Sequence, residues 1–193
     1  VNRDPSGHSL YPGQATTGLC PETDFDGTPL YVTGREPLAA EIARRQALYF
    51  DPYHSAIRNE VARLRELHGA IVLFDAHSIR GRVPRLFDGE LPQFNIGTFD
   101  GRSCAPELAM AVARCCAHPS TVIDGRFKGG WITRHYGDPA NGLHAIQMEL
   151  AMRGYVDEAG PWPPVWDPER AHQLQAVLRD VVGACLDFAK DRP

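Results

Sequence analysis

The sequence predicts a layered α/β fold, a mixed sheet with helices packed on it. Two apolar runs, residues 70–74 and 144–152, have the length of buried strands, and the first is rich in β-branched and aromatic residues. Amphipathic segments with helical spacing alternate with these runs, above all residues 51–68 and the segment that starts after Asp167-Pro168 and carries apolar residues from Leu174 to Phe188. Strands that alternate with helices are typical of layered α/β domains. The 193 residues suffice for one domain with a sizeable core.

The first half of the chain divides into five segments. Residues 1–37, rich in Gly, Pro, Thr and Asp, are expected to be irregular, and long irregular segments in compact domains are often functional. A helix is expected over 37–50, because a proline suits its first turn, and a second over 51–68, where a glycine ends it. The strand at 70–74 then leads into a polar loop, 78–104, which Pro and Gly residues interrupt.

The second half continues the alternation. We expect a helix over 105–117, with Pro and Glu in its first turn, and a short strand over 121–123. A loop over 124–130 follows, and residues 144–152 form the second long strand, although their pattern also fits a helix. Residues 161–164 (PWPP) form a stiff linker before the C-terminal helix.

The composition narrows the class of protein. Hydrophobic residues make up 43% and charged residues 23%, as in ordinary globular domains. The net charge of −4 gives no reason to expect nucleic acid or an anionic membrane as a partner, and no apolar run has the length of a membrane span. Five scattered cysteines without metal-finger spacing indicate reduced thiols. We therefore expect a cytoplasmic protein that has neither nucleic acid nor a membrane as its main partner.

The motif Asp75-Ala76-His77-Ser78 follows the apolar strand at 70–74. Ligand sites in open α/β sheets lie at the carboxyl ends of strands. His77 is therefore a candidate metal ligand or catalytic base, with Asp75 close enough to orient it or to bind beside it. The alternative is a hydrogen-bonded histidine at a strand end with no further role.

Glu149 stands out because it interrupts an apolar run, where an unpaired charge is costly. If the run is a strand, Gln147 and Glu149 share one face and the apolar residues share the other. The functional interpretation is a carboxylate in a cleft, with a pKa suited to moving a proton to and from water. The alternative is a half-exposed strand with a polar outer face.

Two further segments carry groups suited to anion binding. The guanidinium of Arg3, with Asn2 beside it, can hold a carboxylate through paired hydrogen bonds, although an arginine near a terminus is usually solvated. Residues 129–137 combine glycines with Arg134, a histidine and a tyrosine, as both functional loops and ordinary surface loops do. The sequence contains neither a G-x-S-x-G elbow nor a Walker-type loop, which argues against a serine hydrolase and a P-loop protein.

Taken in order, four segments resemble the N-formylglutamate amidohydrolase family: 2–5 (NRDP), 75–78 (DAHS), 125–134 (GRFKGGWITR) and 147–150 (QMEL). The resemblance extends over most of the chain, and the linked set is more specific than any single piece. That family is similar in fold and site to the zinc carboxypeptidases and aspartoacylases. The resemblance therefore implies a three-layer mixed sheet flanked by helices, of the zinc-exopeptidase type.

The resemblance also implies roles for five residues. His77 becomes the third protein ligand of a catalytic Zn²⁺ ion, and Glu149 the general base that takes a proton from water. Asn2 and Arg3 become the clamp for a substrate carboxylate, and Arg134 the partner of a second carboxylate on the substrate. The implied reaction is the zinc-dependent hydrolysis of N-formyl-L-glutamate to formate and L-glutamate, in histidine degradation.

The first two zinc ligands of the family have no counterpart in this sequence, since His8, His54 and His68 stand in no matching motif. We therefore expect residues 1–193 to form a single domain, the C-terminal two-thirds of a longer catalytic domain, with those ligands upstream of Val1. Two alternatives stay open. One is the hydrolysis of another N-acyl amino acid or small amide, and the other is a non-catalytic binding module on the same fold.

Overall fold

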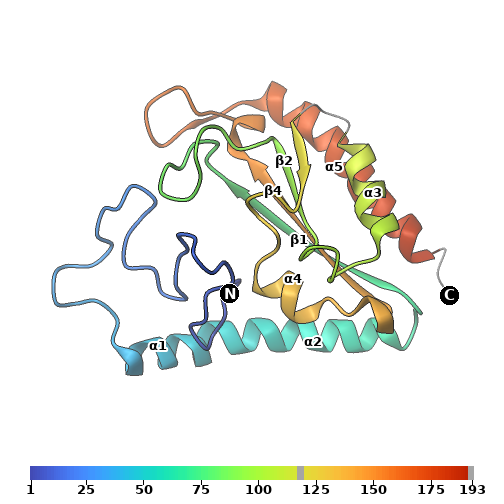
Figure 1. The fold of residues 1–193 in the computed structure, drawn as a ribbon, viewed down its shortest axis with the longest axis horizontal. Coiled ribbons are helices and arrows are strands. Elements are labelled where there is room, and N and C mark those ends of the chain that lie inside the picture. The colour runs from blue at the N-terminus through green and yellow to red at the C-terminus, as the bar shows by residue number, and fades with distance from the viewer. Residues whose placement is uncertain (117–119, 191–193) are drawn as a thin grey trace.

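The computed structural model describes residues 1–116 and 120–190, in which a four-stranded mixed sheet has the order β1-β4-β2-β3 (Figure 1). The strands span Ile71–Ile79 (β1), Phe94–Gly97 (β2), Thr121–Ile123 (β3) and Leu143–Ala151 (β4). β4 runs parallel to β1 and antiparallel to β2, and β2 runs parallel to β3. This is the mixed α/β class that the sequence predicts.

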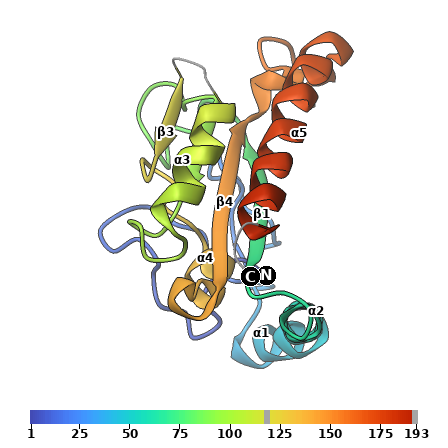
Figure 2. The same cartoon turned by 90° about the vertical axis from the view of Figure 1, so that its right-hand side faces the viewer.

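Helices pack on both faces of the sheet (Figure 2). Helices α3 (Pro106–Cys115) and α5 (Pro168–Lys190) share a core with one face. Helices α2 (Asp51–Arg65) and α4 (Trp131–Tyr136) pack on the other. A π-helical turn, Gln46–Phe50, joins α1 (Ala39–Arg45) to α2, so the two helices expected over 37–68 form one continuous run.

Alternation along β1 explains how the two faces differ. Val72 and Phe74 pack against the core beneath α3 and α5, whereas Ile71 and Leu73 pack with α2 and α4. The central strand β4 is buried on both faces along all nine residues. Its apolar members Ile146, Met148 and Leu150 join the α3–α5 core, which also contains Cys104, Cys116 and Cys185.

The face of β1 that begins with Ile71 and Leu73 continues with Asp75 and His77. It ends with Ile79, which belongs to a third apolar cluster of buried residues. The polar pair therefore lies between two apolar clusters on one face of the sheet.

Two differences from the expected elements concern this region. β1 runs past residue 74 to Ile79, because β4 continues the parallel ladder to Ala151, so the motif at 75–78 lies inside a strand and not after it. The segment 129–137, expected to be a loop, contains α4, which packs its apolar residues against β1 and β4.

The remaining differences lie elsewhere in the sheet. β2 lies within the predicted loop 78–104 and pairs with both β3 and β4. A hairpin of β5 (Val156–Asp157) and β6 (Val165–Trp166) encloses the predicted linker at 161–164. The predicted end of the helix over 105–117 lies outside the described residues.

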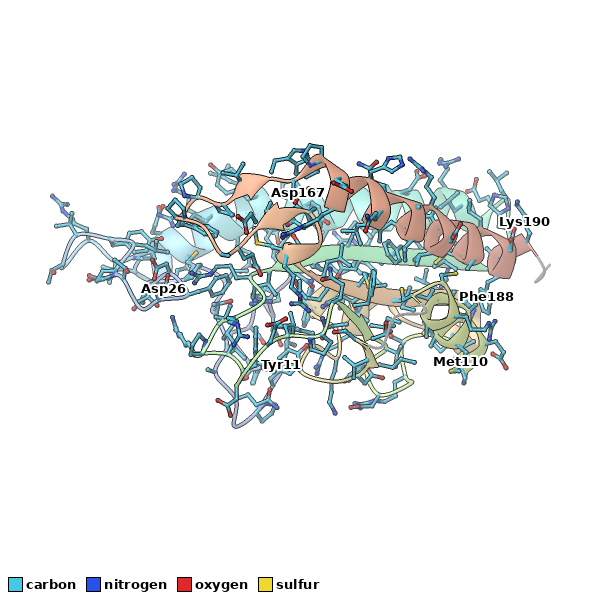
Figure 3. The ribbon with its side chains drawn as sticks, turned by 90° about the horizontal axis from the view of Figure 1, so that it is seen from above. Tyr11, Asp26, Met110, Asp167, Phe188 and Lys190 are labelled. Atoms are coloured by element: carbon cyan, nitrogen blue, oxygen red, sulfur yellow. The ribbon has the colours of Figure 1, made fainter. Side chains whose placement is uncertain are left out.

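The N-terminal segment, residues 1–38, contains no helix or strand beyond one isolated bridge between Thr23 and Pro29, as the sequence predicts (blue in Figure 1). In Figure 3, Tyr11 and Asp26 mark this segment, far from the end of α5 at Lys190. Two short 3₁₀ turns, Pro139–Asn141 and Met152–Gly154, flank β4. Among the described residues, no helix combines the length and the apolar character that crossing a membrane requires.

Candidate functional site

A cavity of about 300 Å³ opens on the face of the sheet that carries His77 and Glu149. The irregular N-terminal segment forms one wall, and the C-terminal halves of β1 and β4 form the other. The loop before α4 closes one side. The lining includes Asn2, Arg3, Tyr11, Thr17, His77, Arg126, Gly130 and Glu149.

Parallel pairing of β1 and β4 brings together polar groups that are candidate site residues in the sequence. The register aligns His77 with Glu149 and Asp75 with Gln147. Register partners on neighbouring strands point to the same face of a sheet. A polar cluster therefore forms from two segments that are about 70 residues apart in the sequence.

Asn2 connects the N-terminal segment to this cluster. Its Nδ2 donates to Asp75 Oδ2 (2.9 Å) and lies 2.8 Å from His77 Nε2, while its Oδ1 accepts a hydrogen bond from the backbone N–H of Ile132 (2.7 Å). Asp75 Oδ1 also lies 2.8 Å from His77 Nε2. A protonated Nε2 donates to Asp75, and a bare Nε2 accepts from Asn2. Asn2 is thus engaged within the protein, and binding a substrate carboxylate would require Nδ2 to leave Asp75.

Gly130 leaves the space that the Asn2 side chain occupies. A Cβ at Gly130 would lie 2.5 Å from Asn2 Nδ2, well inside van der Waals contact. The backbone N–H of Gly130 donates to Gln147 Oε1 (2.7 Å), which fixes the start of α4 to β4. The glycine pair in the predicted functional loop therefore has a physical reason, since Gly129 has a φ of 111° and Gly130 admits Asn2.

Arg3 lines the cavity that Glu149 also lines. Its Nε donates to Thr17 Oγ1 (2.9 Å) and its Nη1 to the carbonyl oxygen of Asn2 (2.9 Å). A guanidinium has five N–H donors, so three remain for a ligand. His54, buried in α2, lies with its Nε2 2.9 Å from the carbonyl oxygen of Val1 and so holds the start of this segment.

His77 and Glu149 both have raised pKa values. The hydrogen bond to Asp75 is the main cause that raises the pKa of His77. Glu149 is only 8% exposed, and the loss of hydration raises its pKa from 4.5 to about 7. The charge of Asp75 adds to this rise, whereas His77 and Arg3 oppose it. A carboxyl group with this pKa can both accept and return a proton near neutral pH.

In the metal-free protein we expect the free energy of unfolding to decrease as the pH rises from about 5 to about 8. In this window the folded state holds the proton on Glu149 more tightly than the unfolded state does, since the pKa is about 7 against 4.5. The raised pKa of His77 acts in the same direction, because its stabilisation is lost as His77 deprotonates.

Urea unfolding of the Glu149→Gln variant, with a chelator present, measures how much Glu149 contributes to this pH dependence of stability. Burying the ionised carboxylate costs about 3 kcal/mol, which the variant avoids. The variant should therefore be more stable than the original protein at pH 8 and gain little at pH 4.5. An identical pH dependence in the two proteins would contradict the burial of a charge at Glu149.

The two arginines of the glycine-rich motif, Arg126 and Arg134, differ in whether they line the cavity. The guanidinium of Arg134 lies 4.7 Å from the ring centroid of Tyr11 and 4.5 Å from that of Phe99, and its Nε donates to the carbonyl oxygen of Gly129 (2.8 Å). Arg134 is not part of the cavity lining, and its role in binding a second carboxylate stays a prediction. Arg126, to which the sequence analysis assigned no role, does line the cavity. Its position in the loop before α4 was the only available signal.

Within the described residues, no group of three or more His, Cys, Asp or Glu side chains is arranged to hold a metal ion. His77 is therefore the one predicted ligand that the described part of the chain offers to such a site. The five cysteines are unpaired, and burial raises the pKa of Cys104 to about 12, as expected of a structural thiol and not of a nucleophile.

Comparison with known proteins identifies the family of this chain. Residues 1–156 match the sequence profile of N-formylglutamate amidohydrolases. The whole chain is 46% identical, over 195 aligned positions, to the N-formylglutamate deformylases of Pseudomonas putida and Pseudomonas aeruginosa, and it covers 72% of each. The crystal structure of N-formylglutamate amidohydrolase from Ralstonia eutropha JMP134 shares the fold, with a TM-score of 0.72 at 23% identity over 99% of this chain and 70% of that one. The chain therefore belongs to the N-formylglutamate amidohydrolase family, which confirms the resemblance found in its sequence.

Proposed function

We propose that this protein hydrolyses N-formyl-L-glutamate to formate and L-glutamate. One observation carries the proposal: Glu149 is a buried carboxyl group with a pKa of about 7, opposite His77, in a cavity that Arg3 also lines. The names of the two Pseudomonas relatives, both N-formylglutamate deformylases, support this substrate. Following the resemblance, we assign the reaction to histidine degradation in the cytoplasm.

Glu149 can perform both proton transfers that amide hydrolysis needs. In its ionised form it takes a proton from water as the oxygen attacks the formyl carbon. It then gives this proton to the glutamate nitrogen as the C–N bond breaks. The water oxygen leaves in formate, and the amine leaves with the returned proton. A pKa of about 7 suits both directions of transfer at neutral pH.

Arg3 can position the substrate for this reaction. Its three remaining N–H donors allow it to hold the α-carboxylate of the substrate with two parallel hydrogen bonds. A carboxylate held at Arg3 places the neighbouring formamide within the cavity that Glu149 lines. Fixing the reacting groups in this way supplies a large part of the rate of a hydrolase.

We further propose that a Zn²⁺ ion binds with His77 as one ligand. The chemistry of His77 suits this role: in the tautomer with the proton on Nε2, His77 donates to Asp75, and Nδ1, which has no hydrogen bond within the described residues, is available to a metal ion. A carboxylate behind a ligating histidine is the usual arrangement at zinc. A site with three protein ligands would need ligands beyond the described residues. Zinc bound there would lower the pKa of a water molecule that it holds.

Formate release from N-formyl-L-glutamate tests the proposed function, in protein that includes any residues encoded before Val1. We expect equal amounts of formate and glutamate, loss of turnover with a chelator and its return with zinc. Turnover that a chelator does not affect would contradict the zinc proposal. Faster hydrolysis of N-acetylglutamate would favour another N-acyl amino acid as substrate, and binding without turnover would favour a binding module.

A further inference from the structure

Arg126 lines the same cavity as Arg3 and Glu149, and the reaction described above assigns it no role. Its Nε donates to the carbonyl oxygen of Leu86 (2.6 Å) and its Nη2 to that of Ala15 (2.8 Å). Three of its five N–H donors therefore have no partner in the described part of the chain. Its hydrogen bonds are to backbone carbonyl groups, and its guanidinium lies 5.3 Å from the ring centroids of Tyr11 and Phe127. No described carboxylate forms an ion pair with it.

The charge of Arg126 is not balanced by an ion pair with any described carboxylate. Burial lowers the pKa of Arg126, the positive charge of Arg3 lowers it further, and Tyr11 opposes the change. The two carboxylates in the cavity lining interact with other groups: Asp4 accepts hydrogen bonds from a neighbouring serine, and the charges of His77 and Arg3 favour the ionised form of Glu149. A partly buried cation without a counter-ion is unfavourable. The Arg126 side of the cavity is therefore complementary to an anionic ligand.

Arg126 and Arg3 are attached to the same short stretch of the N-terminal segment. Arg126 bonds the carbonyl oxygen of Ala15, and Arg3 bonds the hydroxyl of Thr17. Two residues of fully extended chain span at most about 7 Å. The carboxyl carbons of a five-carbon dicarboxylate are about 5 Å apart when its chain is extended, from four C–C bonds of ordinary length. The separation of the two anchoring residues, Ala15 and Thr17, is therefore similar to the separation of the two carboxylates in one small dianion.

We propose that Arg126 determines specificity by binding the side-chain carboxylate of the substrate, while Arg3 binds its α-carboxylate. The site would then select derivatives of five-carbon dicarboxylic amino acids over those with neutral side chains. This assignment deepens the proposed function and rests on it. It replaces the role expected for Arg134, whose guanidinium lies beside the rings of Tyr11 and Phe99 and outside the cavity lining.

Calorimetric binding of glutarate and of pentanoate tests the assignment without requiring turnover. The two ligands have the same number of carbons, but pentanoate lacks the second carboxylate. We expect the original protein to bind glutarate about 10- to 100-fold more tightly, as for a hydrogen-bonded charge pair. Arg126→Met should reduce this ratio to about 1, and Arg126→Lys should give an intermediate value, because lysine keeps the charge but loses the paired geometry. The matched control is Arg82→Met, since Arg82 is exposed and pairs with Glu90 outside the cavity lining.

Three results would overturn the assignment. The first is that the original protein binds glutarate no more tightly than pentanoate, and the second is that Arg126→Met leaves the preference for glutarate unchanged. The third is that Arg126→Met weakens the binding of both ligands equally, which would mean that Arg126 only holds the neighbouring loops in place. Loss of the preference in Arg134→Met alone would return the role to Arg134. Kinetics with N-formyl-L-glutamate and N-formyl-L-glutamine give a second readout, in which Arg126→Met should lose activity on the first substrate only. A glutarate preference that depends on Arg126, without hydrolysis of either substrate, would reject the proposed function and leave this assignment standing.

Discussion

Replacing Glu149 with Gln is expected to lower kcat for N-formyl-L-glutamate hydrolysis by about 10²- to 10⁴-fold. Glutamine has nearly the same volume and still offers a carbonyl acceptor, but it cannot take up a proton from water. KM should change little, because Arg3 and the rest of the cavity lining stay in place. Initial rates of formate release over a range of substrate concentrations measure both constants.

Glu60→Gln is the control for this substitution. Glu60 lies on the exposed side of α2, where it pairs with Arg63, and the same chemical change there should leave kcat unaltered. A Glu149→Gln variant that retains more than about a tenth of kcat would contradict the role of Glu149 as general base. Retained glutarate binding by the variant would show that the cavity is intact and that only the proton transfer is lost.

Gly130→Ala is expected to lower kcat/KM by about 10²-fold while the protein stays folded. The backbone of Gly130, with φ −83° and ψ −162°, is open to alanine, so the cost comes from the new methyl group. That methyl group would lie 2.5 Å from Asn2 Nδ2, and the Asn2 amide must move away from Asp75 and His77. Since Arg3 follows Asn2 directly, the guanidinium would shift with it. Formate-release kinetics and far-UV circular dichroism measure the two quantities.

Gly183→Ala is the matched control. A Cβ at Gly183 in α5 meets nothing within 4 Å, so this variant should keep full activity and gain about 0.5–1 kcal/mol of stability. Asn2→Ala combined with Gly130→Ala should be no less active than Asn2→Ala alone, because both changes remove the same contacts. Full activity of Gly130→Ala would show that the position of Asn2 does not matter for the reaction.

Local patterns were sufficient for the elements with long, regular periodicity. The continuous helical run through α2, the C-terminal helix α5 and the buried strand β4 lie where their apolar spacing predicts them. Glu149 was recognisable from the same local pattern, because a charged residue within a buried apolar run is energetically unfavourable and is therefore often functional. His77 and the Asn2-Arg3 pair needed the additional information of a family resemblance, because each motif alone is common.

Short elements could not be predicted in this way. β2 has four residues and α4 has six, too few for a periodic pattern, and both are stabilised by packing against β4 and not by their own propensity. The extension of β1 through residues 75–78 likewise depends on the ladder that β4 provides. In each case non-local contacts outweigh the local preference.

The sequence by itself determined the fold class, the principal helices and strands, and the residue types available for chemistry. Only the tertiary structure decided which of them meet. The parallel register places His77 opposite Glu149, and the space at Gly130 admits Asn2 beside Asp75. Arg126 lines the cavity whereas Arg134, eight residues later, does not. Both guanidinium groups lie close to the ring of Tyr11, but Arg126 belongs to the loop before α4 and Arg134 to α4 itself, and this difference in backbone position decides which of them reaches the cavity.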